Sequence, residues 1–165
     1  MRLLLSVLLL SQSMYAAAAD KITPQSIQAL VDAQTTAIMQ KDIDRLMTLF
    51  GKNYQQINTA EAKSQSISKD ELQKIYNSNF MVAKLIINQI KVLDNQIAED
   101  GQRGQLKTQV FSRYLIEFQG KQNVLTQEEE WVSDMGLEAG QVVYLRTEKR
   151  PIQASQPAMM PATTD

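Results

Sequence analysis

The sequence contains neither cysteine nor histidine, and these two absences exclude several kinds of chemistry. Without cysteine the chain forms no disulfide, offers no thiolate nucleophile and builds no zinc–thiolate site. Without histidine it has no imidazole base, no Ser-His-Asp or Cys-His pair and no histidine ligand for a metal ion. The sequence also lacks a Gly-rich phosphate loop and an acidic metal cluster. We therefore predict neither a metal site nor a cofactor.

The charges of the chain are balanced and dispersed. There are 17 basic and 18 acidic residues, and the basic residues are scattered rather than clustered. Such a pattern provides no electrostatic surface for nucleic acid or for anionic lipid. A length of 165 residues suits one domain with an ordinary hydrophobic core.

The N-terminus has the features of an export signal. Arg2 precedes an apolar run from Leu3 to Leu10, and four alanines end at Ala19 just before Asp20. This pattern predicts a signal peptide over residues 1–19, cleaved after Ala19, and hence a periplasmic or secreted protein. The apolar run is much shorter than the roughly 20 residues that span a membrane, so we expect no stable membrane anchor.

The first half of the mature chain has helical patterns. Thr23-Pro24 resembles a helix start, and a helical stripe of core positions follows it. That stripe consists of Ile27, Leu30, Val31, Gln34, Ala37 and Ile38. Asp42 is expected to cap a second helix with an apolar stripe ending at Phe50, and Gly51 is expected to stop it. A short polar segment over residues 54–58 is interpreted as an edge strand.

The second half changes from helix to sheet. Ser68 to Glu71 forms a capping box, which predicts a third helix with Leu72, Ile75, Tyr76 and Phe80 on its apolar face. Four stretches rich in β-branched and aromatic residues follow, at 82–93, 106–118, 124–134 and 141–149. Gly-containing loops at 99–104, 119–123 and 135–140 separate them, which predicts an antiparallel meander. The expected fold is α+β, with N-terminal helices packed on a curved antiparallel sheet over residues 20–150. Residues 151–165, rich in Pro, Ser, Thr and Ala, are predicted to form a disordered C-terminal tail.

This order of elements resembles the nuclear transport factor 2-like superfamily. The resemblance rests on Ala37 to Phe50, on the strand Glu128-Glu129-Glu130-Trp131 and on the segment from Gly140 to Leu145, and it spans residues 23–150. It implies a cone in which a bent sheet wraps around helices and encloses a pocket, often with dimerisation through the sheet. A Trp often follows the Gly in the last strand of that family, whereas this chain has Tyr144. A cystatin-like or other helix-on-sheet fold is the alternative.

Alternation along the strands predicts which residues line the pocket. Glu128 and Glu130 share one face of their strand, and Gln127, Glu129 and Trp131 share the other. With a loop centred near Lys121, the first face comes beside Ser112 and Tyr114 and is the more apolar. We assign this face to the pocket, with Tyr76 approaching its mouth. The outer face then carries Phe111, Trp131 and Tyr144 as one aromatic cluster.

Both groups of residues have two interpretations. Glu128 or Glu130 could act as a general acid or base in apolar surroundings, or both could lie at a solvated rim and pair with Lys107 or Lys149. The cluster of Phe111, Trp131 and Tyr144 could anchor a homodimer through the sheet, or it could be a packed cluster without a partner.

Two functions remain open, with a third as a structural alternative. The first is an exported, non-catalytic domain of the nuclear transport factor 2-like type that binds a protein partner or a small apolar ligand in the bacterial envelope. The second is a small pocket enzyme, similar to isomerases or hydrolases of that superfamily, that uses carboxylate acid–base chemistry. The absence of histidine excludes the histidine-dependent members. The third is a structural envelope protein tethered through its C-terminal tail.

Overall fold

The computed structural model describes residues 20–59, 64–118 and 120–152. Within these ranges the elements are α1 (Pro24–Gln40), α2 (Ile43–Thr48), β1 (Phe50–Asn58), β2 (Gln65–Ser68), α3 (Lys69–Val82), β3 (Ala83–Ile97), β4 (Arg103–Phe118), β5 (Lys121–Glu138) and β6 (Gln141–Pro151). No helix in the described ranges is long and apolar enough to cross a membrane. The predicted signal peptide lies outside these residues. So does the predicted tail from residue 153 onward; of its first two residues, Pro151 belongs to β6 and Ile152 follows that strand.

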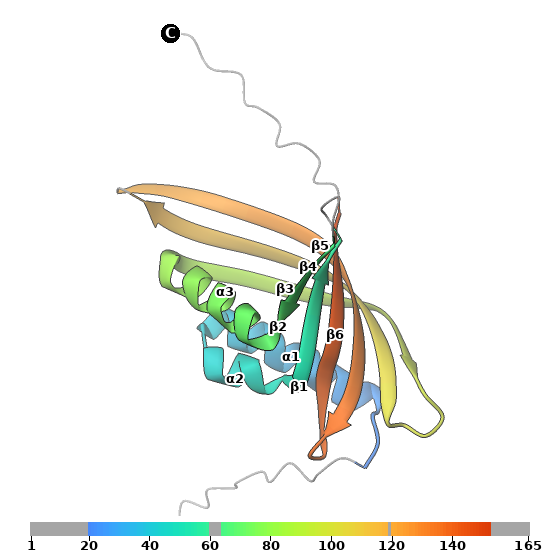
Figure 1. Ribbon diagram of the computed structural model, residues 1–165. Coiled ribbons are helices and arrows are strands. Elements are labelled where there is room, and N and C mark those ends of the chain that lie inside the picture. The colour runs from blue at the N-terminus through green and yellow to red at the C-terminus, as the bar shows by residue number, and fades with distance from the viewer. Residues whose placement is uncertain (1–19, 60–63, 119, 153–165) are drawn as a thin grey trace, which may run out of the picture.

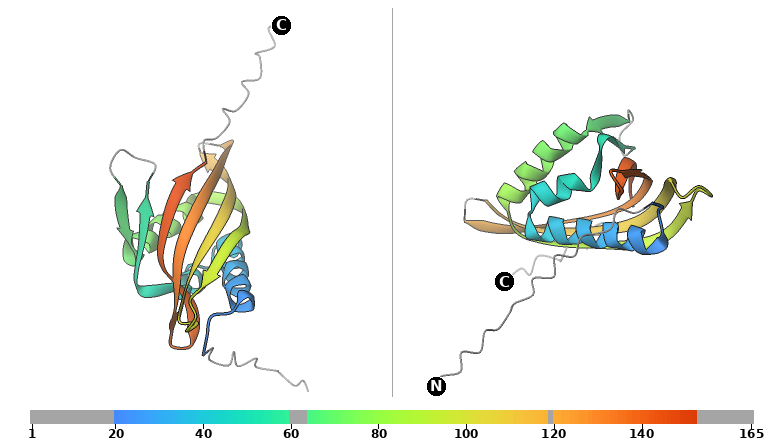
Figure 2. Two further views of the ribbon diagram at one scale, coloured as in Figure 1. Left: turned by 90° about the vertical axis from the view of Figure 1, so that its right-hand side faces the viewer. Right: turned by 90° about the horizontal axis from the view of Figure 1, so that it is seen from below.

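The strands form one curved sheet in the order β2-β1-β6-β5-β4-β3. Neighbouring strands are antiparallel except β1 and β6, which pair in parallel. The helices lie on the concave side of the sheet, and the long β4–β5 hairpin extends over α3 (Figure 1). Figure 2 shows the open outer face of the sheet with the helices behind it. The predicted α+β class, with helices packed on a curved sheet, is confirmed.

The sequence signals place the helices well. Thr23 caps α1 by accepting a hydrogen bond from the backbone N–H of Ser26. The six residues of the predicted stripe are the buried residues of the helix. Lys41 then adopts a left-handed conformation with φ of 56°, and Asp42 caps α2 through its side chain. A tight corner therefore lies between the first two helices, as the sequence predicts.

Two predictions about the following segment are wrong. Helix α2 ends at Thr48, so Phe50 and Gly51 belong to β1 and not to a helix end. The ring of Phe50 packs on Tyr54 at 4.5 Å and on Tyr144 at 5.6 Å between centroids, and these contacts favour strand geometry at Phe50. Strand β1 is also not an edge strand, because it lies between β2 and β6.

The hairpin turns are tighter than the predicted loops. Phe118 pairs with Lys121, so only two residues separate β4 from β5, and the second, Gly120, has φ of +74°. Glu138 pairs with Gln141 across a second two-residue turn, in which Ala139 and Gly140 have positive φ. Residues expected in loops at 121–123 and 135–138 therefore lie in β5. The shorter β4–β5 turn changes which residues of these two strands share a face.

Candidate functional site

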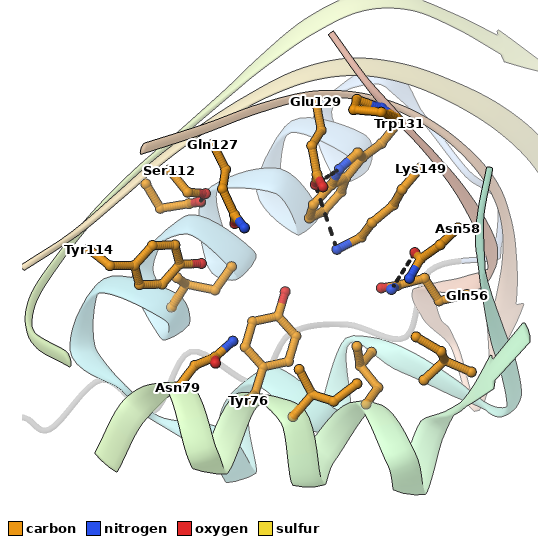
Figure 3. Close-up of a pocket in the computed structure, with 16 residues that line it drawn as sticks. Gln56, Asn58, Tyr76, Asn79, Ser112, Tyr114, Gln127, Glu129, Trp131 and Lys149 are labelled. Carbon is orange, nitrogen blue, oxygen red and sulfur yellow. Dashed lines mark hydrogen bonds and ion pairs between the residues drawn. The ribbon is translucent and has the colours of Figure 1, made fainter. Parts of the chain in front are cut away.

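A cavity of about 280 Å³ lies between α3 and the concave face of the sheet (Figure 3). Its sheet wall comes from all six strands, β1 to β6, and its helix wall comes mainly from α3. The lining residues are Ile38, Gln56, Asn58, Ile67, Leu72, Ile75, Tyr76, Asn79, Asn88, Ser112, Tyr114, Gln127, Glu129, Trp131, Lys149 and Pro151. The cavity is therefore apolar along α3 and largely polar along the sheet.

The position of α3 follows from its cap. Ser68 and Glu71 form a reciprocal capping box, in which the Glu71 carboxylate accepts hydrogen bonds from both the Ser68 backbone N–H and its hydroxyl. These hydrogen bonds to its carboxylate lower the pKa of Glu71. The helix then presents Leu72, Ile75 and Tyr76 to the cavity at the spacing of one helical face.

Strand register places the polar wall. Asn88 of β3 pairs with Ser112 of β4, which pairs with Gln127 of β5, so these three side chains form one row across the sheet. Side chains along a strand return to the same face every second residue. Glu129 and Trp131 of β5 therefore share the face of Gln127, and Lys149 pairs with Trp131 across the next ladder.

Asn88 is the least satisfied polar group of this wall. Its side chain is buried, with 2 % of its surface exposed, and its amide oxygen accepts a hydrogen bond of 2.8 Å from the Ser112 hydroxyl. The Asn88 amide nitrogen, Nδ2, has no hydrogen-bond partner among the described residues. A buried donor without a partner destabilises the fold by about 1–3 kcal/mol. Asn88, which lines the cavity, therefore carries a donor without a partner among the described residues.

Glu129, Trp131 and Lys149 form the charged end of the cavity. The Trp131 indole donates a 2.7 Å hydrogen bond to Oε2 of Glu129. The Lys149 ammonium lies 3.9 Å from the same oxygen and 3.9 Å from the centroid of the Trp131 ring (Figure 3). Burial lowers the pKa of Lys149, and the Glu129 carboxylate opposes that shift. The two opposite charges leave this end of the cavity without net charge.

Two tyrosines enter the cavity from opposite walls. The Tyr76 hydroxyl points from α3 toward the centre of the cavity, and Tyr114 reaches in from β4 (Figure 3). Burial raises the pKa of Tyr76 well above its usual value, and it also raises the pKa of Tyr114. Both phenols are therefore neutral at physiological pH and can donate hydrogen bonds.

The structure brings together only some of the predicted pocket residues. Tyr76, Ser112 and Tyr114 line the cavity. Glu128 and Glu130 do not, because Ser112 pairs with Gln127 and the two-residue turn places them on the opposite face. The predicted face assignment within β5 is therefore wrong.

Both displaced glutamates have partners outside the cavity. The Glu130 carboxylate forms an ion pair of 3.0 Å with Lys107, and Glu128 accepts a 2.6 Å hydrogen bond from Gln109. For Glu130 the structure therefore matches the alternative interpretation, in which it pairs with Lys107.

The predicted aromatic cluster does not form. Trp131 lines the cavity, whereas Phe111 lies on the outer face with the Arg113 guanidinium 5.6 Å from its ring centroid. Tyr144 is buried in the core, where its hydroxyl donates a 2.8 Å hydrogen bond to Oε1 of Gln34. The three residues therefore cannot form a common dimer surface.

Sequence reasoning missed seven polar residues of the site, namely Gln56, Asn58, Asn79, Asn88, Gln127, Glu129 and Lys149. The available signal was Gln119-Gly120, since a glycine at the second position suits a two-residue hairpin turn. Centring the hairpin there pairs Ser112 with Gln127 and places Glu129 inside. Among the described residues no group of three or more acidic side chains could hold a metal ion.

Comparisons with known proteins identify the fold. No family model matches the sequence, and no curated protein sequence matches it. Many solved structures, however, match the fold of the chain. A ketosteroid isomerase-like protein from Erwinia carotovora atroseptica aligns with a TM-score of 0.60 at 15 % identity, covering 78 % of this chain and 95 % of that one. The chain has the nuclear transport factor 2-like fold.

Two further solved structures with a similar fold show how widely it is used. An NTF-2-like protein from Silicibacter pomeroyi aligns with a TM-score of 0.57 at 12 % identity, over 78 % of this chain and 94 % of that one. A type 2 hexachlorocyclohexane dehydrochlorinase aligns with a TM-score of 0.61 at 10 % identity, over 85 % of this chain and 94 % of that one. At such identities the likeness establishes the fold alone.

Proposed function

We propose that this protein is an exported, non-catalytic binding domain that holds a small, uncharged organic ligand in the cavity between α3 and the sheet. The observation that supports this most directly is the Asn88 amide, which lines the cavity and whose buried Nδ2 has no partner among the described residues. Ligand sites combine apolar walls with a few placed polar groups, and this cavity has that composition.

The two polar ends of the cavity limit the shape of the ligand. The row of Asn88, Ser112 and Gln127 lies four residues along β5 from Trp131, a separation of about 13 Å. Between them Leu72 and Ile75 provide an apolar wall from α3. An elongated molecule with a hydrogen-bond acceptor near Asn88 and an apolar body along α3 fits this arrangement. Because Glu129 and Lys149 balance each other, a neutral molecule needs no further counter-charge.

Trp131 makes the proposal directly testable. It is the single tryptophan of the chain and it lines the cavity, so intrinsic fluorescence reports occupancy. Titration with small neutral alcohols and ketones, beginning with benzyl alcohol, should shift or quench this fluorescence in a saturable way. No response to any member of the panel, together with no co-purifying small molecule in native mass spectrometry, would contradict the proposal.

A matched pair of substitutions tests the role of Asn88. Asn88→Leu removes the unpartnered donor, whereas Gln89→Leu changes the next residue of β3, which is exposed. One hydrogen bond contributes about 1 kcal/mol, so Asn88→Leu should weaken binding of an acceptor-bearing ligand about fivefold. Gln89→Leu should leave the affinity unchanged. Equal affinities for the two variants would exclude Asn88 as a ligand contact.

Carboxylate catalysis is the second candidate function. By its position, Glu129 is a better candidate for the acid or base than Glu128 or Glu130. Glu129 lines the cavity and faces the neutral Tyr76 phenol, an arrangement suited to general acid–base chemistry. Replacing Glu129 with Gln separates the two functions, because an enzyme would lose turnover and a binding domain would keep its ligand. A wild-type protein that shows no measurable reaction with its ligand, together with a variant that binds this ligand equally well, supports the first candidate.

Export and assembly have their own tests. Mass spectrometry of protein from a periplasmic extract should find Asp20 at the mature N-terminus, as the predicted signal peptide requires.

Association as a homodimer or with a protein partner would use the outer face of the sheet, which carries Phe111 and Arg113. Light scattering coupled to size-exclusion chromatography measures whether the protein is a homodimer. If it is, Phe111→Ser should dissociate that dimer.

A further inference from the structure

Lys149 differs from the surface lysines in its surroundings. Its side chain, 15 % exposed, points from β6 into the cavity (Figure 3). Within the described part of the chain its ammonium donates no hydrogen bond. Its neighbours are Glu129, at 3.9 Å, and the face of the Trp131 ring. Lys107, by contrast, is 44 % exposed and forms a close ion pair of 3.0 Å with Glu130. Lys149 is therefore a cavity amine whose N–H groups are available to a ligand.

These surroundings suit an amine nucleophile. A lysine reacts as its neutral amine, and removal from water favours that form over the ammonium. Burial lowers the pKa of Lys149, in agreement with this reasoning. The Glu129 carboxylate is close enough to accept the ammonium proton, directly or through one water molecule. The Trp131 indole holds that carboxylate in place through its 2.7 Å hydrogen bond.

We propose that Lys149 captures a small aldehyde or ketone in the cavity as a reversible imine. This inference rests on the proposed binding function and names the chemical class of its ligand. The Lys149 ammonium gives one proton to Glu129, and the nitrogen lone pair attacks the carbonyl carbon. The C=O π bond breaks toward oxygen, which takes the proton from Glu129 and becomes the hydroxyl of a carbinolamine. That hydroxyl leaves as water with a second proton from the nitrogen while the nitrogen lone pair forms the C=N bond, so an ammonium and a carbonyl give an iminium, which keeps the last N–H and the positive charge, and one water.

Reductive trapping tests the proposal. The mature chain is incubated with benzaldehyde and cyanoborohydride at neutral pH, and labelled lysines are then located by peptide mass spectrometry. Removal from water favours the neutral amine of Lys149, which also lies beside a carboxylate that can accept its proton. We therefore expect benzylation of Lys149 to be faster than that of Lys107, which serves as an internal control because it also pairs with a glutamate but is exposed. Labelling of Lys149 no faster than Lys107 would overturn the proposal.

Two controls separate this inference from the binding function. Lys149→Arg keeps the positive charge and removes the nucleophile, so the fast labelling should disappear while slow surface labelling remains. Benzyl alcohol has the same ring without a carbonyl, and its binding is followed by Trp131 fluorescence. Saturable binding of benzyl alcohol without trapping of benzaldehyde would refute imine formation and leave the binding function standing. If benzyl alcohol does not bind and benzaldehyde is not trapped, both the binding function and imine formation are refuted.

Discussion

At the scale of single residues, Asn88 shows a conflict between stability and binding. Its Nδ2 lacks a partner among the described residues, while its oxygen is held by Ser112. Replacing both partners of a buried hydrogen bond by apolar groups is neutral or stabilising, and here it also removes an unsatisfied donor. We predict that the double variant Asn88→Leu, Ser112→Ala gains about 1 kcal/mol in free energy of unfolding and binds ligand more weakly. Urea denaturation followed by circular dichroism measures the first effect, and a loss of stability would show that Nδ2 is satisfied in the free protein.

The buried tyrosines give a prediction about alkaline pH. Burial raises the pKa of Tyr54, Tyr76 and Tyr144 above the usual value near 10. Above pH 10 the unfolded chain therefore loses protons that the folded chain retains, and the free energy of unfolding falls as pH rises. We expect phenolate absorbance from these residues to appear together with unfolding, in one cooperative step. Gradual titration of all of them in a chain that stays folded would contradict this expectation.

Single residues also show what could be predicted about the site. The cavity position of Tyr76 could be predicted from the helical stripe of α3, and those of Ser112 and Tyr114 could be predicted from alternation in β4. The cavity positions of Glu129 and Lys149 could not be predicted, because the face of β5 depends on the length of the β4–β5 turn, and a turn one residue longer or shorter inverts the assignment.

At the scale of elements, α3 depends on its N-terminal cap. Ser68 and Glu71 satisfy backbone N–H groups that would otherwise lack partners. Ser68→Ala should lower the free energy of unfolding by about 1 kcal/mol and weaken ligand binding, since α3 carries the apolar wall of the cavity. Ser66→Ala, two residues earlier on β2 and exposed, is the matched control and should change neither property. Equal stabilities for the two variants in urea would show that the cap contributes nothing.

Element boundaries were predictable where local chemistry decides them. The caps at Thr23, Asp42 and Ser68 start the three helices as predicted. The end of α2 was not predictable, because Phe50 continues the helical apolar spacing and yet joins β1, where Tyr54 and Tyr144 pack on its ring. Contacts distant in sequence decide that boundary.

At the scale of the whole molecule, one buried hydrogen bond connects the helical layer to the sheet. The Tyr144 hydroxyl of β6 donates to Gln34 of α1, and both side chains are buried. Tyr144→Phe should lower the free energy of unfolding by about 1–3 kcal/mol, because the Gln34 oxygen loses its donor. Adding Gln34→Leu should recover part of that loss. A double-mutant cycle with zero coupling energy would show that the contact does not stabilise the fold.

The overall topology was only partly accessible to sequence reasoning. The meander of β3 to β6 follows from glycine-containing turns between long apolar strands. The parallel pairing of β1 with β6 joins segments more than 80 residues apart, and no local pattern encodes it. The resemblance to nuclear transport factor 2-like proteins implied the bent sheet around the helices but not this pairing, since the first strand was expected at an edge.

The location of β6 inside the sheet has a consequence for synthesis and folding. Strands β1 and β2 attach to the rest of the sheet only through β6, which is the last strand to leave the ribosome. The N-terminal third of the chain must therefore wait, without its sheet partner, until residue 151 is available. Such non-local closure is slow compared with helix formation. The native sheet should accordingly close only after β6 has been synthesised, and until then β1 and β2 pair with each other but not with the rest of the sheet.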